Sequence, residues 1–237
     1  MQPQRTAIVT GAASGIGLAT VTRLRASGWR AIGIDRNGTP ADEHVVGDAG
    51  DPRTLDAALE RAGERLDGLV CSAGLPPAGP WDDLDGFDEL LRVNLRAPFL
   101  TVRAALPRLR RAGGSVVLIG SIVGAQEGSP RSPGYAATKA GIEGLARSLA
   151  LVAAPEVRIN VLAAGAIETP FDDVAFPPSH RPDVPLGRMG TADEIAKVAE
   201  VLLSDASAYV TGAVWRVDGG RAILAGPDAV RRATLER

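Results

Sequence analysis

The sequence has few of the residues that build disulfide frameworks and metal sites. It contains one cysteine, Cys71, which excludes an intrachain disulfide. Its two histidines, His44 and His180, lie far apart, and no group of residues has the spacing of metal ligands, so we predict no metal. Catalysis by this chain should therefore depend on general acid–base chemistry or on an organic cofactor.

Long apolar runs and an excess of charge of one sign are also missing. No hydrophobic stretch reaches the length of a membrane span, and the apolar run near the start is too short for a signal peptide. The 26 basic and 28 acidic residues give a formal net charge of −2, which offers no basic surface to a nucleic acid. We expect a cytoplasmic protein that binds neither nucleic acid nor membrane.

Short apolar segments alternate with longer ones along the chain. We predict strands at 6–10, 31–34, 44–46, 68–71, 115–119, 157–162 and 214–217, and helices at 15–27, 53–66, 84–91, 95–111, 134–153 and 191–203. The last helix starts with a capping box, Thr191 to Glu194. Nearly uninterrupted apolar strands between helices are typical of a parallel sheet covered on both faces. We therefore predict an α/β fold: one doubly wound, Rossmann-like domain over residues 1–237, with a mostly parallel seven-stranded sheet.

A glycine-rich loop, TGAASGIG, spans Thr10 to Gly17 between the first strand and the first helix. Gly11 permits the turn, Gly15 lets the backbone approach a pyrophosphate, and Gly17 lets the helix pack on the sheet. The N-terminus of the helix favours an anion, so Ser14 and Ile16 join the predicted cofactor contacts. The loop predicts a dinucleotide site.

An acidic residue follows this loop at the end of the second strand. Asp35 stands where a carboxylate can bind the ribose hydroxyls of an adenosine. A 2′-phosphate beside this carboxylate would be repelled, so we predict NAD rather than NADP as the cofactor. Arg36 is the residue that could pair with such a phosphate.

Further motifs follow the loop in order. Tyr135-Ala-Ala-Thr-Lys139 has the form YxxxK, Ser121 ends a strand, and Asn94 lies in Val93-Asn94-Leu95. With the loop, these motifs resemble the short-chain dehydrogenase/reductase family, as do Pro185–Gly190 and Tyr209–Gly220. The resemblance extends from Thr10 to Gly220 and implies a nicotinamide-dependent oxidoreductase. A shorter likeness, in Asp67–Cys71, Ala73–Leu75 and the tail beyond Gly220, is to the hydroxysteroid dehydrogenase/carbonyl reductase branch.

Two segments depart from the family pattern. Cys71-Ser72-Ala73-Gly74 stands where the family has NNAG, which puts the structural role of the asparagine in doubt. Ala164-Gly165 stands where the family has PG after the sixth strand, which loosens that turn.

The predicted catalytic chemistry centres on a tyrosine and a lysine. Tyr135 and Lys139 are four residues apart and share a helix face. A free tyrosine has a pKa of about 10, and a nearby cation favours its phenolate. Tyr135 can then exchange a proton with an alcohol or a carbonyl, and Ser121 can hydrogen-bond the same oxygen. The resemblance implies that Asn94 anchors a water that links Lys139 to solvent.

Other cofactor contacts are implied by the resemblance alone. Asp48 and Ala49 would lie at the adenine, and Ala73 and Gly74 would pass under the adenosine ribose. Ile167 and Thr169 would bind the nicotinamide amide, with Tyr135 and Lys139 beside the cofactor as well.

Three alternatives remain open at this point. The chain could be an NADPH-dependent ketoreductase of carrier-bound acyl groups, against which Asp35 argues. It could be an epimerase or dehydratase, although such relatives usually carry a larger substrate domain after the position of Pro170. It could also be a non-catalytic dinucleotide sensor, against which the four intact catalytic positions argue.

The segment Phe171–Val184 occupies the place of the family's substrate lid. Its prolines stiffen it, Phe171, Val174 and Phe176 offer an apolar wall, and Arg181 is its one basic residue. We predict an uncharged, largely apolar, cyclic or bulky substrate; a charged one would direct attention to His180 and Arg181.

We also predict a homotetramer, or a homodimer that uses the same surfaces. Helices 95–111 and 134–153 carry apolar residues beyond one sheet-facing stripe, and the resemblance implies that they pair between subunits. These residues are Leu100, Leu106, Ile142, Leu145 and Leu149.

Overall fold

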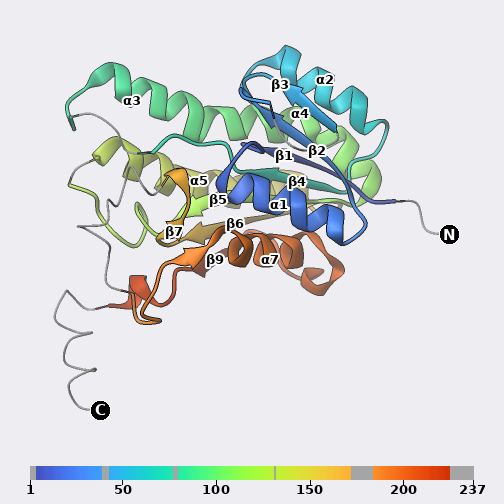
Figure 1. Cartoon of the computed structure of the whole chain (residues 1–237). Helices are drawn as coiled ribbons and strands as arrows, with labels where there is room; N and C mark the ends of the chain where they lie inside the picture. The colour runs from blue at the N-terminus through green and yellow to red at the C-terminus, as the bar shows by residue number, and fades with distance from the viewer. Residues whose placement is uncertain (1–3, 39–42, 77–79, 131, 172–183, 225–237) are drawn as a thin grey trace.

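The computed structural model describes residues 4–38, 43–76, 80–130, 132–171 and 184–224. At their centre lies a seven-stranded sheet in the order β3-β2-β1-β4-β5-β6-β9, in which every neighbouring pair is parallel (Figure 1). The predicted doubly wound α/β fold is therefore confirmed. The strands are β1 (Thr6–Thr10), β2 (Arg30–Asp35), β3 (Glu43–Val46), β4 (Gly68–Cys71), β5 (Ser115–Ser121), β6 (Arg158–Ala164) and β9 (Val214–Val217).

Helices cover both faces of the sheet (Figure 1). On one face, α1 (Gly15–Ala26) and α7 (Ala192–Leu203) bury a cluster that includes Leu24 and Ile195. On the other, α2 (Pro52–Ala62), α4 (Ala97–Ala112) and α5 (Pro133–Ala153) bury a cluster that includes Val102 and Ile142. Because both faces of the central strands are covered, these strands have apolar residues at successive positions.

Helix α2 ends earlier than its sequence pattern predicts. We predicted a helix to Leu66, but α2 ends at Ala62. Gly63 follows with a φ of 81°, a conformation that glycine adopts without steric cost. The apolar Leu66 is buried in the core as part of the connection to β4, not as part of the helix.

The segment predicted as two separate helices is one continuous helical run. It consists of α3 (Leu84–Leu91), the π-turn η1 (Arg92–Arg96) and α4. Within η1, the Ala97 N–H donates to the Arg92 carbonyl, five residues back. Pro98 has no N–H to offer the Asn94 carbonyl four residues earlier. The wider turn buries Asn94, and such turns are frequent at functional sites.

Short elements not predicted from the sequence complete the described part. β7 (Ile167–Glu168) pairs in parallel with β8 (Gly190–Thr191), so the two ends of the intervening segment lie side by side. Two 3₁₀ turns, η3 (Asp205–Ser207) and η4 (Arg221–Ile223), flank β9 in sequence. Elements of two or three residues are too short to show a hydrophobic period.

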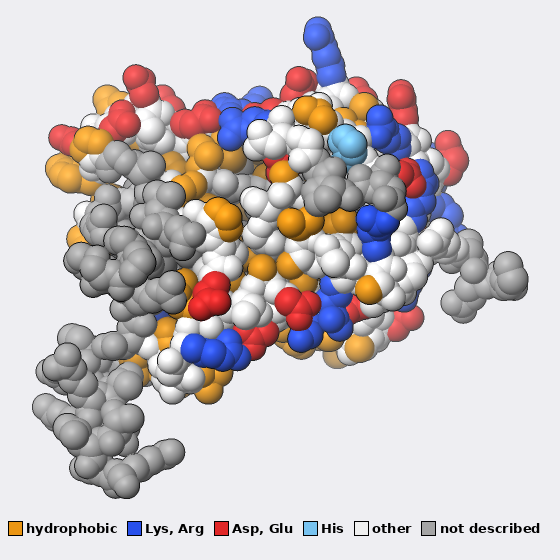
Figure 2. Space-filling model, in the orientation of Figure 1, with side chains coloured by type: hydrophobic (Ala, Val, Ile, Leu, Met, Phe, Trp, Pro, Cys, Tyr) orange, Lys and Arg blue, Asp and Glu red, His pale blue; other side chains and the backbone are white. Residues whose placement is uncertain are grey.

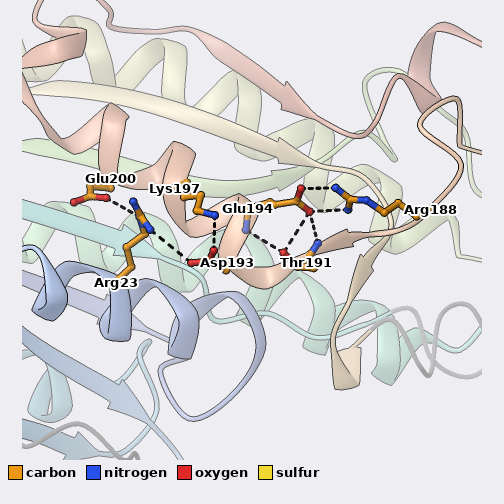
Figure 3. A network of polar contacts seen from close by, with 7 residues as sticks. All are labelled: Arg23, Arg188, Thr191, Asp193, Glu194, Lys197 and Glu200. Carbon is orange, nitrogen blue, oxygen red and sulfur yellow. Dashed lines mark hydrogen bonds and ion pairs between the residues drawn. The ribbon is translucent and has the colours of Figure 1, made fainter.

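The start of α7 carries a polar network (Figure 3). The predicted capping box is confirmed: the Glu194 N–H donates to Thr191 Oγ1, and the Thr191 N–H donates to the Glu194 carboxylate. Arg188 binds the same carboxylate at 2.6 Å, and Arg23 of α1 contacts Glu200 at 2.7 Å. The network ties α1 to α7 at the surface, where single ion pairs contribute little.

The visible face of the molecule has acidic and basic side chains interspersed, with no broad area of one sign (Figure 2). Among the helices in the described ranges, none combines the length and the apolar character that crossing a bilayer requires.

Candidate active site

A cavity of about 760 Å³ opens at the carboxyl ends of the strands. In open parallel sheets, ligands bind outside these ends, near the point where the strand order reverses, which here lies between β1 and β4. The end of β2 with the residues that follow it (34–37) and the residues after β3 (47–49) form one part of its lining, called here the β2–β3 side. Residues 119–123, 127–130, Tyr135, Lys139 and Arg221 form the β5–β9 side.

The glycine loop connects the two sides, and its glycines are sterically required. Gly11 has a φ of 69°, and a Cβ there would lie 2.8 Å from Ala73 Cα. A Cβ on Gly17 would lie 2.0 Å from the Gly11 carbonyl oxygen. Gly11, Ser14, Gly15 and Ile16 line the cavity, whereas Gly17 does not. Gly17 thus lets α1 pack closely against the loop, and the others leave backbone exposed to a ligand.

Two carboxylates mark the β2–β3 side. Asp35 accepts hydrogen bonds from the N–H groups of Ala13 at 3.0 Å and Asn37 at 2.9 Å. Asp48 accepts one from the Gly50 N–H at 2.7 Å and one from Arg92 at 2.9 Å. Both carboxylates are therefore held at the edge of the cavity.

The pKa of Asp48 reflects opposing influences. Burial acts to raise the pKa, but the hydrogen bonds from Gly50 and Arg92 and the charges of Arg92 and Arg36 together hold it below its ordinary value. Asp48 is therefore a carboxylate at neutral pH, and Arg36 lies close enough to interact with it.

Thr10 has a structural role that the sequence analysis missed. Its hydroxyl accepts hydrogen bonds from the N–H groups of Ser72 and Ala73, both at 3.1 Å. This joins the ends of β1 and β4 at the segment where the chain departs from the family's NNAG. A threonine that ends an apolar strand beside the glycine loop is the only sequence signal for it.

Tyr135, Lys139 and Ser121 all line the β5–β9 side. Ser132 caps α5 by accepting the Tyr135 N–H at 3.3 Å, which fixes the start of the helix. Lys139 Nζ lies 5.7 Å from the centroid of the Tyr135 ring and donates to the Ile119 carbonyl at 3.1 Å. Burial lowers the pKa of Lys139 to about 8. The sequence therefore predicted three residues that the fold brings to one place.

Asn94 lies beside this group but does not line the cavity. Its Oδ1 accepts from the Leu75 N–H at 2.7 Å, and its Nδ2 donates to the Leu75 carbonyl at 3.0 Å. The side chain thus clamps the segment after β4. A Cβ on Gly74 would lie 3.3 Å from Asn94 Oδ1 and 3.8 Å from Lys139 Nζ, so the three residues are close neighbours.

The other predicted contacts also lie on the cavity: Ala49, Ala73, Gly74, Ile167 and Thr169. In the turn after β6, where the family has PG, Gly165 packs closely on the segment after β9: a Cβ there would lie 2.6 Å from Asp218 Cα, and its N–H donates to the Val217 carbonyl at 3.0 Å. Of the predicted lid, Phe171 lines the cavity with its ring 6.1 Å from that of Tyr135. Val174, Phe176, His180 and Arg181 lie outside the described residues.

Neither Glu127 nor Arg221 is among the site residues predicted from the sequence. Both line the β5–β9 side and form an ion pair at 3.1 Å. They are 94 residues apart, so no local pattern could connect them. Within the described parts of the chain, no group of three or more His, Cys, Asp or Glu residues could hold a metal ion.

The chain matches the family model described as enoyl-(acyl carrier protein) reductase over residues 11–222. Over 240 residues it is 35% identical to protein FixR of Bradyrhizobium diazoefficiens, covering 90% of this chain and 85% of that protein. It is 36% identical to cis-4-hydroxycyclohexanecarboxylate dehydrogenase of Sinomonas cyclohexanicum, covering 92% and 96%. It is 35% identical to the 3-oxoacyl-[acyl-carrier-protein] reductase FabG of Escherichia coli, covering 90% and 96%.

Among solved structures, the chain is similar to the ligand-free aldohexose dehydrogenase of Thermoplasma acidophilum. The TM-score is 0.86 at 27% sequence identity, and the match covers 94% of this chain and 96% of that one. With the matched family model and these relatives, the glycine loop and the YxxxK helix show that the chain belongs to the short-chain dehydrogenase/reductase family of oxidoreductases.

Proposed function

We propose that this oxidoreductase, whose family uses a nicotinamide dinucleotide, interconverts a secondary alcohol and a ketone with NAD(H). The substrate we propose is uncharged, largely apolar, and cyclic or bulky. The observation that carries the proposal is the convergence of Ser121, Tyr135 and Lys139 on one side of a cavity whose other side presents Asp35.

In the proposed mechanism, Tyr135 moves the proton. Its hydroxyl takes the proton of the alcohol in oxidation and returns it to the carbonyl oxygen in reduction. Ser121 donates to the same oxygen and holds it in place. The bound nicotinamide supplies the chemistry of hydride transfer.

Lys139 and Asn94 would support Tyr135. Below a pH of about 8, buried Lys139 carries a charge that favours the phenolate form of its neighbour. The clamp from Asn94 to Leu75 keeps the segment beside Lys139 in place. Pro98 has no N–H to donate to the Asn94 carbonyl. This missing helical hydrogen bond supports the predicted role of Asn94 in anchoring a water.

The residues of the cavity suit a dinucleotide. Gly11 and Gly15 expose backbone where side chains would fill the space, and α1 directs its N-terminal N–H groups toward an anion. Asp35 is held where it can accept ribose hydroxyls. A 2′-phosphate there would meet a fixed carboxylate, which supports NAD(H) over NADP(H).

Arg36 is the residue that could reverse this preference. It already has anionic neighbours. The hydrogen bond from Arg92 is the main cause of the lowered pKa of Glu89, but the charge of Arg36 contributes, as it does at Asp48. We therefore propose that the carboxylates of Asp48 and Glu89 compete with a 2′-phosphate for the charge of Arg36.

The relatives leave a second candidate, an NADPH-dependent reductase of carrier-bound acyl groups. The names of the family model and of the Escherichia coli relative favour it. The Sinomonas relative is named for a hydroxycyclohexanecarboxylate, which is a cyclic alcohol but carries a charge. Its ring, and the ring of Phe171 beside Tyr135, favour the cyclic alcohol over the carrier-bound acyl group.

Steady-state kinetics distinguishes the two. Absorbance at 340 nm (the reduced nicotinamide band) should report oxidation of cyclic secondary alcohols with NAD. We expect a preference for NAD over NADP of about a hundredfold in kcat/KM, since each 1.4 kcal/mol of discrimination is tenfold. Efficient reduction of 3-oxoacyl thioesters with NADPH, without activity on the alcohols, would instead establish the second candidate.

We also propose a homo-oligomer that uses the surface of α4 and α5. A groove of about 600 Å³ there is lined by Leu91, Leu95, Phe99 and Leu145, among others. Of the residues predicted for this interface, Ile142 is instead buried in the core, and the others pack partly against it. Light scattering at micromolar concentration should give a dimer or tetramer, and a monomer would contradict the proposal.

A further inference from the structure

Two charged side chains on the β5–β9 side have no part in the mechanism described above. Glu127 lies in the loop after β5, and Arg221 lies in η4, after β9. The guanidinium donates from Nε to Glu127 Oε1 and from Nη2 to Oε2, both at 3.1 Å. The side chain of Glu127 is 25% exposed and that of Arg221 is 19% exposed. The pair is therefore largely buried, and both of its side chains line the cavity.

Backbone turns hold both partners in position. The Glu127 N–H donates to the Ile122 carbonyl at 3.0 Å, one residue after Ser121. The Asp218 carboxylate accepts the N–H groups of Gly220 and Ala222 at 2.9 Å and so shapes the turn that carries the arginine. The pair is thus built into the same side of the cavity as the catalytic serine.

The other charged residues that line the cavity already have a place in the proposed function. Among the described lining residues, the cations are Arg36, Lys139 and Arg221, and the anions are Asp35, Asp48 and Glu127. Asp35, Arg36 and Asp48 belong to the β2–β3 side, and Lys139 lies beside Tyr135. Of the charged residues in this set, only Glu127 and Arg221 are left to contact the part of a substrate that lies beyond its reacting carbon.

An ion pair selects against charge on a ligand. A carboxylate placed beside it is attracted by the guanidinium and repelled by Glu127 at similar distances, while it still loses its hydration. A hydroxyl group has no such conflict, since it can donate to the Glu127 carboxylate, which has acceptor sites besides those that Arg221 uses.

We propose that the Glu127–Arg221 pair recognises a second, neutral hydroxyl group of the substrate, which donates to Glu127, and that the pair disfavours a carboxylate at that place. This inference rests on the proposed function, because it assumes a cyclic secondary alcohol at Tyr135. The substrate class is then a neutral cyclic diol whose second oxygen lies away from the reacting carbon.

Three matched alcohols test the inference with NAD: cyclohexanol, cyclohexane-1,4-diol and 4-hydroxycyclohexanecarboxylate. For the wild-type protein we expect kcat/KM to be highest for the diol and lowest for the carboxylate. Glu127→Gln removes the negative charge of the pair, so the ratio of carboxylate to diol should rise about tenfold, mostly through KM. Arg221→Gln leaves Glu127 uncompensated, so the same ratio should fall. Arg221→Lys retains the charge and should keep the ratio near that of the wild type.

Glu143→Gln is the matched control. Glu143 contacts the same loop through Gln126 but does not line the cavity, so its substitution should leave the ratio unchanged. An equal loss on all three alcohols in both Glu127→Gln and Arg221→Gln would mean that the pair is only structural, and would overturn the inference. So would a wild-type preference for the carboxylate. Turnover of cyclohexanol in either case would leave the proposed function standing, whereas no turnover of any alcohol would overturn both.

Discussion

The two sides of the cavity are stabilised in different ways. On the β2–β3 side, Asp35 and Asp48 each accept the N–H of the residue two positions later in a local turn. Each also accepts a hydrogen bond from a residue more distant in the chain: Asp35 from Ala13 and Asp48 from Arg92. On the β5–β9 side, Lys139 is held by the Ile119 carbonyl and Glu127 by Arg221, across 20 and 94 residues. Local turns therefore contribute to the orientation of the carboxylates that should set cofactor preference, whereas the contacts that hold Lys139 and Glu127, on the side of chemistry and substrate choice, form only in the assembled fold.

The most severe test is Tyr135→Phe, which removes one hydroxyl from the β5–β9 side. We expect kcat to fall by at least about 10²- to 10⁴-fold, the usual contribution of a positioned acid–base group. NAD(H) binding, measured by calorimetry, should change little because the β2–β3 side is untouched. Wild-type turnover in this variant would rule out the mechanism.

Lys139→Met should separate function from stability on the same side. Activity should fall severely, and what remains should need a higher pH because the phenolate loses its cation. At pH 7, however, the free energy of unfolding should rise by up to about 3 kcal/mol, because the buried lysine, with its pKa lowered to about 8, is charged at a cost in the folded state. The lost hydrogen bond to Ile119 offsets part of this gain.

The sign of the pH dependence follows from proton release. The folded wild-type protein loses the Lys139 proton near pH 8, whereas the unfolded chain keeps it to a pH of about 10.4. Wild-type stability should therefore rise across this interval, and the advantage of Lys139→Met should disappear over it. Denaturant melts at pH 7 and pH 10 check this, and an advantage that does not depend on pH would contradict it.

Asp35→Ser changes the β2–β3 side and should leave the chemistry intact. Removing the carboxylate removes the repulsion of a 2′-phosphate, about 1 to 4 kcal/mol for charges 4 Å apart. The preference for NAD over NADP should shrink by about tenfold or more, with kcat nearly unchanged for the better cofactor. A large loss of kcat with both cofactors would show that the two sides are not independent.

The smallest effect should come from a change outside both sides. Thr191→Ala removes the capping side chain of α7 (Figure 3) and should cost about 1 kcal/mol of stability. Thermal unfolding measures the loss, and kcat/KM at low temperature should stay at the wild-type value. An accompanying loss of activity would link α7 to the cavity more tightly than its contacts suggest.

By itself, the sequence determined the sheet, the glycine loop and the positions of Tyr135 and Lys139. These features depend on local periods and spacings: apolar runs for strands, glycines where a Cβ has no room, and four residues between two side chains on one helix. The capping box of α7 was predictable for the same reason. At Gly63, the chain leaves the helix although the apolar pattern continues to Leu66, so the prediction was wrong only about where α2 ends.

Only the tertiary structure decided how the β5–β9 side is completed. The continuous helix through Asn94 could not be predicted, because a π-turn shows no distinct hydrophobic period. Two further contacts join segments that meet only in the folded sheet. Asn94 accepts the N–H of Leu75, and the Thr10 hydroxyl accepts the N–H of Ala73. The pairing of Glu127 with Arg221 has the same cause: β5, β6 and β9 are neighbours in the sheet, and their carboxyl ends bring together side chains that lie far apart in the sequence.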